Sequence, residues 1–365
     1  MIRDGIRATR GIFRQTLETT RAVGRTLGVD VDTVQETVEK LPLIKDTVSR
    51  AASLSQKVAP DKAPLYKQDA GPHQVGTHQQ DFVDPTRGRK IPMTVYYPMG
   101  EETEAHSSPV VVFSHGLAGN SKTYRYLGRH WASHGYTVVQ PTHVGSDTKA
   151  VLTKTPLGAF NKGELIERTR DVSFALDKME SGELPEVVTR QADMNHVGLA
   201  GHSFGALTTE AMAGVNVKDG EKRLELGDER VDAFVAISGY GDALPTRLLG
   251  LDADTYDQVD QPILFVAGEK DTLFTLGKGA GVHTEPFHQT ATSETGAVVV
   301  GGTRHNDFGQ VFGYANKDAA DLTRSSTLAF FDAQLKDDSE ARSYLVEDLP
   351  KVAASWDSEA TYGKS

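Results

Sequence analysis

The chain has 365 residues, no cysteine and a formal net charge of −11. The lack of cysteine excludes disulfides, thiolate metal sites and a cysteine nucleophile, and the acidic charge argues against a nucleic-acid partner. A chain of this length forms one large domain or two small ones and buries enough surface to fold without covalent cross-links.

The first part of the chain, residues 1–65, predicts a helical extension. Apolar side chains recur at helical spacing from Ile2 to Leu17. The first 25 residues hold six arginines and two acidic residues, so they carry +4 and the remaining 340 residues carry −15. This pattern predicts peripheral membrane contact or self-association through residues 1–60. The interpretation that we favour is a helix that packs on its own acidic domain or is loosely tethered to it.

The sequence contains no recognisable transmembrane segment. Its apolar run Pro109–Leu117 is far shorter than the ~20 residues that span a bilayer. Charged side chains interrupt the N-terminal residues repeatedly, which is unlike the apolar core of a secretory signal. We therefore expect a cytoplasmic protein.

Residues 66–340 predict one α/β domain. Two strand-like runs, Gln79–Val83 and Ile91–Tyr97, flank a turn and predict an antiparallel hairpin. Short apolar runs then alternate with helical stretches, which indicates a mainly parallel sheet with helices on both faces. The expected strands are Pro109–Ser114, Tyr136–Gln140, His196–Ala200, Ala233–Ser238, Ile263–Ala267 and Ala297–Val300, and the expected helices are Tyr124–His134, Lys162–Glu180, Phe204–Ala213 and Lys317–Leu335.

Residues 341–365 predict a polar C-terminal extension. Four apolar side chains in this segment are expected to anchor it to the domain: Leu345, Leu349, Val352 and Trp356.

The motif Gly201-His-Ser-Phe-Gly205 lies between a predicted strand and a predicted helix. This context is typical of a nucleophile elbow, in which a sharp turn projects the serine above the sheet and leaves no room for a Cβ two residues away on either side. The N-terminus of the following helix favours developing negative charge. We predict that Ser203 is a nucleophile.

A serine nucleophile needs a base, and three histidines follow Ser203 in the chain. His305 comes directly after a predicted strand, on a loop that suits delivery of the base. His283 and His288 lie in an irregular segment and are expected on an exposed loop or at the pocket rim.

The acid that orients the base has two candidates. Asp271 follows the strand Ile263–Ala267, beside the expected loop of His305. Asp242 follows the preceding strand, and its alternative interpretation is an ordinary turn residue. We favour Asp271 and keep Asp242 as the alternative acid.

The strand that ends in Ser114-His-Gly-Leu-Ala-Gly119 predicts an oxyanion hole. Its glycines allow the loop to fold over the site with amide groups exposed, so the backbone N–H groups of Leu117 and Phe204 are the expected donors. His115 and His202 are expected to brace loops rather than to react.

These motifs resemble the α/β-hydrolase superfamily. The likeness covers about residues 75–335, and the chain is most similar to the group of platelet-activating-factor acetylhydrolase type II and predicted dienelactone hydrolases, near bacterial polyester hydrolases and cutinases. The segments that carry it are Phe113–Gly119, Arg168–Asp177, Gly201–Gly205 and Gly301–His305.

The resemblance implies an α/β-hydrolase fold and a carboxylic ester hydrolase with neither a metal nor an organic cofactor. It implies that Ser203 is the nucleophile, His305 the base, and Leu117 and Phe204 the oxyanion donors. Members of the lipid acetylhydrolase branch carry the acid where this chain has Asp242, whereas the cutinase-like branch carries it one strand later.

We thus expect a serine esterase that cleaves esters of short to medium acyl groups, lipid and polyester esters included, through an acyl-enzyme on Ser203. The alternatives are an acyltransferase with the same triad and a lipid acetylhydrolase that acts at membranes through the basic N-terminal segment. The expected substrate pocket is lined by Tyr124, His143, Leu273 and Phe274.

Overall fold

The structure is a computed structural model that describes most of the chain after residue 61. The helical extension expected over residues 1–65 therefore lies almost entirely outside the described residues. These are 62–100, 105–154, 156–273, 275, 279–309 and 316–364, with the side chains of residues 156 and 157 left out.

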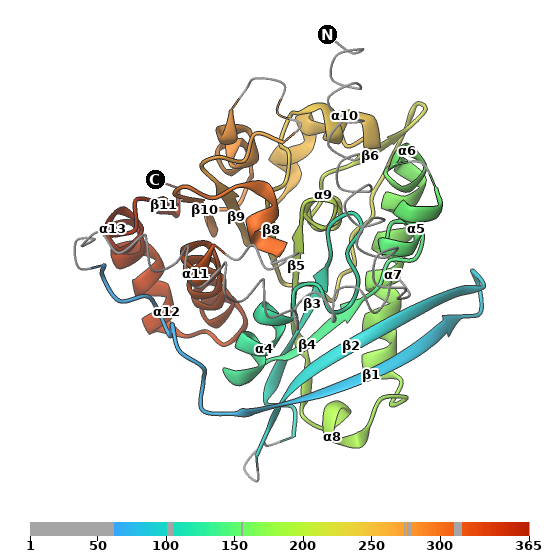
Figure 1. Cartoon of the computed structure of the whole chain (residues 1–365), viewed down its shortest axis with the longest axis horizontal. Helices are drawn as coiled ribbons and strands as arrows, with labels where there is room; N and C mark the ends of the chain where they lie inside the picture. Colours follow the sequence, from blue (N-terminus) through green and yellow to red (C-terminus); the bar gives the residue numbers. More distant parts are fainter. Residues whose placement is uncertain are drawn as a thin grey trace, which may run out of the picture.

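One mixed sheet of nine strands organises the described residues, in the order β1-β2-β4-β3-β5-β8-β9-β10-β11 (Figure 1). The six strands from β4 to β10 in this order are parallel, as the alternating pattern predicts. The bounds are β1 Gln74–Asp84, β2 Arg89–Met99, β3 Ser108–Ser114, β4 Thr137–Pro141, β5 Ala192–His202, β8 Ala233–Ile237, β9 Ile263–Gly268, β10 Thr295–Val300 and β11 Glu359–Tyr362.

The predicted hairpin is present at one edge of the sheet. β1 and β2 pair antiparallel, with Phe82 opposite Ile91, and β2 then pairs antiparallel with β4. The turn closes because the carboxylate of Asp84 accepts hydrogen bonds from the backbone N–H and the hydroxyl of Thr86, at 2.9 and 2.6 Å. Gly88 completes the turn at φ 58°, a conformation that glycine adopts without strain.

Helices cover both faces of the sheet (Figure 1). On one face α7 (Lys162–Glu180) and α9 (Phe204–Met212) bury apolar side chains such as Leu165, Val172 and Leu207. On the other face α4 (Arg125–Ser133) and α11 (Lys317–Leu335) bury Trp131 and Phe331, whose rings meet edge to face at 5.3 Å. The predicted architecture is confirmed.

Shorter elements complete the domain. A small hairpin, β6 (Val217–Asp219) and β7 (Lys222–Leu224), extends from the end of α9. The short helices are α5 Thr148–Thr153, α6 Pro156–Ala159, α8 Glu186–Thr189, α10 Leu244–Leu249, α12 Ser339–Ser343 and α13 Leu349–Ser355, with 3-10 turns at η1 Ala253–Gln258, η2 Ala280–His283, η3 Glu285–His288 and η4 His305–Gly309.

The C-terminal residues are more closely integrated than a polar extension would be. After α12, one π-turn, η6 (Tyr344–Asp348), leads into α13, and β11 then pairs antiparallel with β10 as the last strand of the sheet. The expected anchors Leu345 and Leu349 are fully buried. Trp356 donates from Nε1 to the carbonyl of Ala63 at 2.9 Å, which fastens the start of the described chain to its end.

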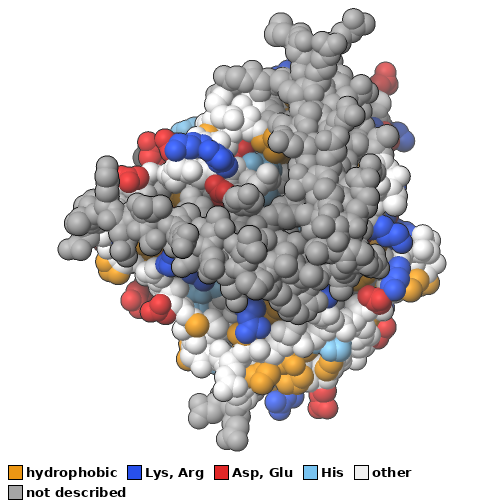
Figure 2. Space-filling model, viewed as in Figure 1, with side chains coloured by type: hydrophobic (Ala, Val, Ile, Leu, Met, Phe, Trp, Pro, Cys, Tyr) orange, Lys and Arg blue, Asp and Glu red, His pale blue; other side chains and the backbone are white. Residues whose placement is uncertain are grey.

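The surface in this view mixes charges of both signs. Both acidic and basic side chains are visible around its margin (Figure 2). None of the helices among the described residues is long and apolar enough to cross a membrane.

Candidate active site

The turn from β5 into α9 places Ser203 above the carboxyl end of the sheet. Ser203 has φ 57° and ψ −114°, a strained conformation for a residue with a side chain. A Cβ at Gly201 would lie 2.1 Å from the carbonyl oxygen of Gly205, and one at Gly205 would lie 1.9 Å from that of Ser114. The turn therefore requires glycine at both positions. The backbone N–H of Ser203 donates to Ile237 at 2.9 Å, which pins the turn to β8.

Three side chains from distant parts of the chain converge at this turn. His305, at the start of η4, has Nε2 at 2.8 Å from the Ser203 hydroxyl and Nδ1 at 2.8 Å from Oδ2 of Asp271. Because the carboxylate only accepts, Nδ1 carries the proton and Nε2 accepts from Ser203. Asp271 follows β9 and is fully buried. This arrangement is a hydrogen-bonded chain from serine through histidine to aspartate.

Asp271 is ionised in this setting. Burial alone would raise its pKa, but the charges and hydrogen bonds of His305 and His283 hold the pKa well below its ordinary value. The backbone N–H of Leu273 adds a hydrogen bond to Oδ1 at 3.3 Å. A fixed negative charge therefore faces His305.

Asp242, the alternative acid, lies in a different environment. It is partly exposed and forms a two-pronged ion pair with Arg247, at 2.8 and 2.6 Å. The structure thus brings Asp271 to His305 and assigns Asp242 to a surface ion pair.

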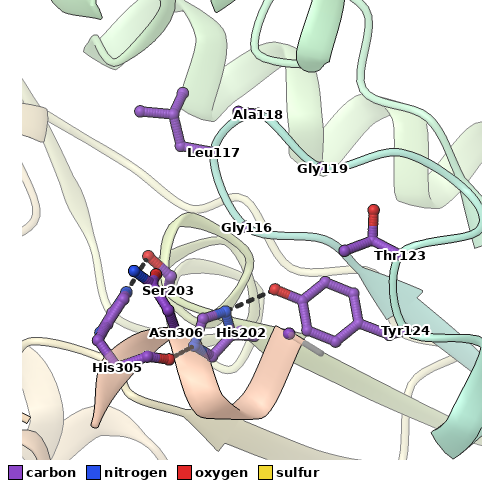
Figure 3. Close-up of a pocket in the computed structure, with 11 residues that line it drawn as sticks. Gly116, Leu117, Ala118, Gly119, Thr123, Tyr124, His202, Ser203, His305 and Asn306 are labelled. Carbon is purple, nitrogen blue, oxygen red and sulfur yellow. Dashed lines mark hydrogen bonds between the residues drawn. The ribbon is translucent and has the colours of Figure 1, made fainter. Parts of the chain in front are cut away.

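The loop after β3 forms the opposite wall of the site. It lines a small cavity of about 90 Å³ with the Ser203 turn and the His305 loop (Figure 3). Ala118 adopts φ 66° there, and its N–H donates to the carbonyl of Ser146 at 2.9 Å. The lining residues are Gly116, Leu117, Ala118, Gly119, Thr123, Tyr124, His202, Ser203, His305, Asn306 and Gly309.

A buried polar network supports this loop from below. Arg168 of α7 is fully buried and donates to the carbonyl of His115 and, at 3.1 Å, to the hydroxyl of Ser114. His115 donates from Nδ1 to the carbonyl of Gly116 at 2.7 Å and accepts from the backbone N–H of His143 at 2.9 Å. The expectation that His115 braces the loop fits these contacts.

Comparison with known proteins finds similarity in sequence and in fold. A family model described as Chlorophyllase matches residues 69–237. Two cutinases of Thermobifida alba, est2 and est1, are each 25% identical over 202 residues, 55% of this chain and 52% and 53% of theirs. A ferulic acid esterase structure from Streptomyces cinnamoneus has a TM-score of 0.52 at 19% identity, covering 74% of this chain and 92% of that one.

The chain has the fold of an α/β-hydrolase and is similar in sequence to cutinases over about half of its length. The resemblance stated from its motifs is thereby confirmed at the level of the superfamily and the cutinases. Likeness to the lipid acetylhydrolase branch stays a prediction. The chain spans about half the length of the cutinases it matches.

The pocket residues expected for this α/β-hydrolase need correction. Tyr124 lines the cavity, but the expectation for His143 is wrong. Its imidazole is fully buried beneath the loop, donating to Asp171 at 3.1 Å and accepting from Ser114 at 3.0 Å. Leu273 is half-buried beside Asp271 and is not among the lining residues, and Phe274 lies outside the described residues.

Leu117 and Phe204, the expected oxyanion donors, lie on the loop after β3 and directly after Ser203. Leu117 lines the cavity. Phe204 is the first residue of α9, where a backbone N–H has no partner within the helix. Its ring is fully buried and packs on Phe160 at 4.7 Å, so only its backbone can face the site.

His202 positions the loop of His305. It donates from Nε2 to the carbonyl of His305 at 3.0 Å and accepts at Nδ1 from the hydroxyl of Tyr124 at 2.6 Å (Figure 3). Burial lowers the pKa of His202 well below its ordinary value, with the charge of His305 adding to the effect. His202 is therefore neutral and holds the loop of His305 in place through hydrogen bonds, in agreement with its expected structural role.

Two further residues at the site were not predicted. The buried hydroxyl of Tyr240, just after β8, lies 3.4 Å from the Ser203 oxygen and 3.3 Å from Nε2 of His305. His283, expected on an exposed loop or pocket rim, is fully buried against Asp271. Their only sequence signal is their position after a strand end or within an irregular loop, which many residues share.

The described residues give no sign of a metal site. Among them, no group of three or more histidine and acidic side chains is arranged to hold an ion.

Proposed function

We propose that this α/β-hydrolase cleaves carboxylic esters through an acyl-enzyme formed on Ser203. The observation that carries the proposal is the continuous hydrogen-bonded chain from Ser203 through His305 to Asp271, with 2.8 Å at each step. Similarity to two cutinases and to a ferulic acid esterase fold supports the same chemistry.

The reaction follows from the positions of these groups. Ser203 Oγ attacks the ester carbonyl as its proton passes to Nε2 of His305, and the resulting imidazolium is stabilised by Asp271. The oxyanion is held by the backbone N–H groups of Leu117 and Phe204. The protonated His305 gives its proton to the leaving alcohol, and water then attacks the acyl-enzyme with His305 again as base.

The small cavity favours short to medium acyl groups. At about 90 Å³ it lies between the loop after β3 and the η4 turn. Leu117, Ala118 and Tyr124 are among the residues that line it. A panel of p-nitrophenyl esters of increasing acyl length, together with a phospholipid and a polyester film, would define the substrate class.

The test of the proposal compares wild type with Ser203→Ala. Removal of the nucleophile is expected to lower ester turnover by about 10⁶-fold, effectively to background, with the fold unchanged. Ser181→Ala, at the exposed end of α7, is the matched control and should keep full activity. Retained hydrolysis in Ser203→Ala would refute the assignment.

Acyl transfer to an alcohol uses the same catalytic groups as hydrolysis. The two reactions differ only in the molecule that takes the acyl group from Ser203. Its contribution is measured by the partition of product between water and an added alcohol. Dominant transfer to the alcohol at low concentration would make the protein an acyltransferase.

The N-terminal segment carries a separate proposal. Its +4 charge over 25 residues supports contact with anionic lipid or self-association. Deletion of residues 1–60, followed by sizing and by flotation with anionic and neutral vesicles, distinguishes the two. Unchanged size and unchanged flotation would leave packing against the acidic domain as the explanation.

A further inference from the structure

Behind the serine–histidine–aspartate chain lies a second histidine that the proposed mechanism does not use. His283 ends η2 and its side chain is fully buried. Its Nε2 lies 3.0 Å from the carbonyl oxygen of Asp271 and 3.3 Å from Oδ1 of the same residue. Its Nδ1 is within hydrogen-bond distance of the carbonyl oxygen of Gly239, after β8.

Each of these partners can only accept a hydrogen bond. A neutral imidazole has one N–H and one bare nitrogen, so one of its nitrogens would face an oxygen lone pair in a site without exposure to solvent. Such a buried, unpaired contact is destabilising by about 1–3 kcal/mol. The imidazolium form donates at both nitrogens and satisfies all three oxygens.

We propose that His283 is a permanently charged imidazolium that holds Asp271 in place and offsets part of its negative charge. It is a positioning residue, because it contacts the carboxylate and not the reacting atoms. Asp271 thereby stands between two imidazole rings, with His305 on Oδ2 and His283 on Oδ1.

The groups packed around His283 fit a cation. Besides Asp271, the acidic group near it is Glu210 of α9, whose carboxyl oxygen lies 1.9 Å from where a Cβ on Gly239 would stand. Burial raises the pKa of Glu210 to about 7, while the hydroxyl of Tyr256 and the charge of His283 act in the opposite direction. Tyr240 presents its ring to the imidazole edge at 5.4 Å.

The other titratable neighbours are histidines. His305 shares Asp271, and His202 is neutral because its two nitrogens are already matched to a donor and an acceptor. Burial acts to lower the pKa of His283, but its hydrogen bond to Asp271 and the charge of that carboxylate outweigh burial and raise it. The direction agrees with the geometric argument.

The charge of His283 has a consequence for the proposed reaction. A cation on the far side of Asp271 weakens the attraction of that carboxylate for the proton on His305. Replacing His283 with a neutral side chain should therefore make His305 easier to protonate. The acid limb of the rate profile would then move to higher pH.

The first test observes the charge directly and does not depend on activity. The full-length protein is labelled with ¹⁵N-histidine and the ring nitrogens are observed by NMR. One histidine should show both ring nitrogens protonated, with chemical shifts that do not change from about pH 5 to 9. This signal should be absent in His283→Gln. Gly281→Ala, in the same 3-10 turn as His283, gives a second way to assign this signal to His283. The substitution does not disturb the site, because nothing lies within 4 Å of the added Cβ. A neutral tautomer at His283 would overturn the proposal, whether or not His283→Gln folds.

The second test rests on the proposed function and measures kcat/KM against pH. His283→Gln is expected to move the midpoint of the acid limb up by about one unit. His288→Gln, an exposed histidine on η3, is the matched control and should leave it in place. A rate loss in His283→Gln at every pH with an unmoved midpoint would show a merely structural role. If Ser203→Ala retains activity, the proposed function fails while the NMR result still stands.

Discussion

The two aspartates that compete for the role of acid differ most clearly in their partners. Asp271 is fully buried and accepts a hydrogen bond from Nδ1 of His305, whereas Asp242 forms an exposed ion pair with Arg247. Asp271→Asn should lower kcat by about 10⁴-fold, because an amide no longer stabilises the imidazolium and favours the wrong tautomer. Asp242→Asn should change kcat by less than about twofold. Steady-state kinetics on one p-nitrophenyl ester compares them, and a larger loss at Asp242 would reverse the assignment.

For single residues too, the sequence predicts those site residues that lie in recognisable motifs. It does not predict the residues whose position depends on packing between distant elements. Ser203 and His305 follow strand ends in recognisable motifs, and the structure brings them together. The position of His143 beneath the loop depends on Arg168 and Asp171, which approach from α7. Contacts of this kind form only in the folded sheet, so no spacing rule indicates them.

The turn between β5 and α9 is the element on which the site depends most. A Cβ at Gly205 would meet the carbonyl oxygen of Ser114 at 1.9 Å, and this atom belongs to the backbone of a central strand and cannot move aside. Gly205→Ala should therefore destabilise the protein by about 3 kcal/mol or more. Gly100→Ala, with nothing within 4 Å of the added Cβ, is the control. Urea unfolding measures both, and equal midpoints would contradict the close approach.

Among the elements, long periodic helices were the most predictable. The predicted ranges of α7 and α11 match the structure. Helix α7 buries one continuous face, whereas α11 is buried on nearly every side. The strand β11 was not predicted, since its four residues alternate between exposed and half-buried positions and resemble a loop. It forms because β10 would otherwise expose an unpaired edge.

Across the whole molecule, Asp332 of α11 connects distant segments. The buried carboxylate accepts from the hydroxyls of Tyr136 and Tyr66, at 2.7 and 3.0 Å, and pairs with Lys67 and Lys336. Burial would raise its pKa, but Lys336, Lys67 and the hydroxyl of Tyr136 lower the pKa overall. The ionised form thus stabilises the fold at pH values above the unfolded pKa of about 4, and this contribution is lost as the pH falls further.

The expected result is a pH-dependent effect of Asp332→Asn. At neutral pH the substitution should lower the free energy of unfolding by about 2 kcal/mol, because the partly exposed Lys67 and Lys336 lose their counter-charge and the buried amide cannot accept all of the hydrogen bonds that the carboxylate accepts. As the pH falls from about 4 toward 3 the difference from wild type should shrink, because the unfolded wild-type chain takes up a proton there before the folded carboxylate does. Asp318→Asn, a half-exposed member of the same helix, controls for surface charge. A constant difference across this range would contradict the account.

The sequence predicted the overall architecture because alternation of buried strands and amphipathic helices is a property of the whole chain. The mixed sheet with helices on both faces is confirmed. The division at residue 341 rested on polarity, which does not show that α12, α13 and β11 pack onto the same sheet. The predictions for residues 1–65 stay predictions.

Ser203 is proposed to be the activated nucleophile of the site, and a fluorophosphonate reacts with such a serine by forming an O–P bond as fluoride leaves. Intact-mass and peptide-mapping spectrometry after treatment with a fluorophosphonate ester tests this most directly. We predict one adduct per chain, located on the peptide that contains Ser203 and absent from Ser203→Ala. No adduct, or an equal adduct in Ser203→Ala, would contradict the account.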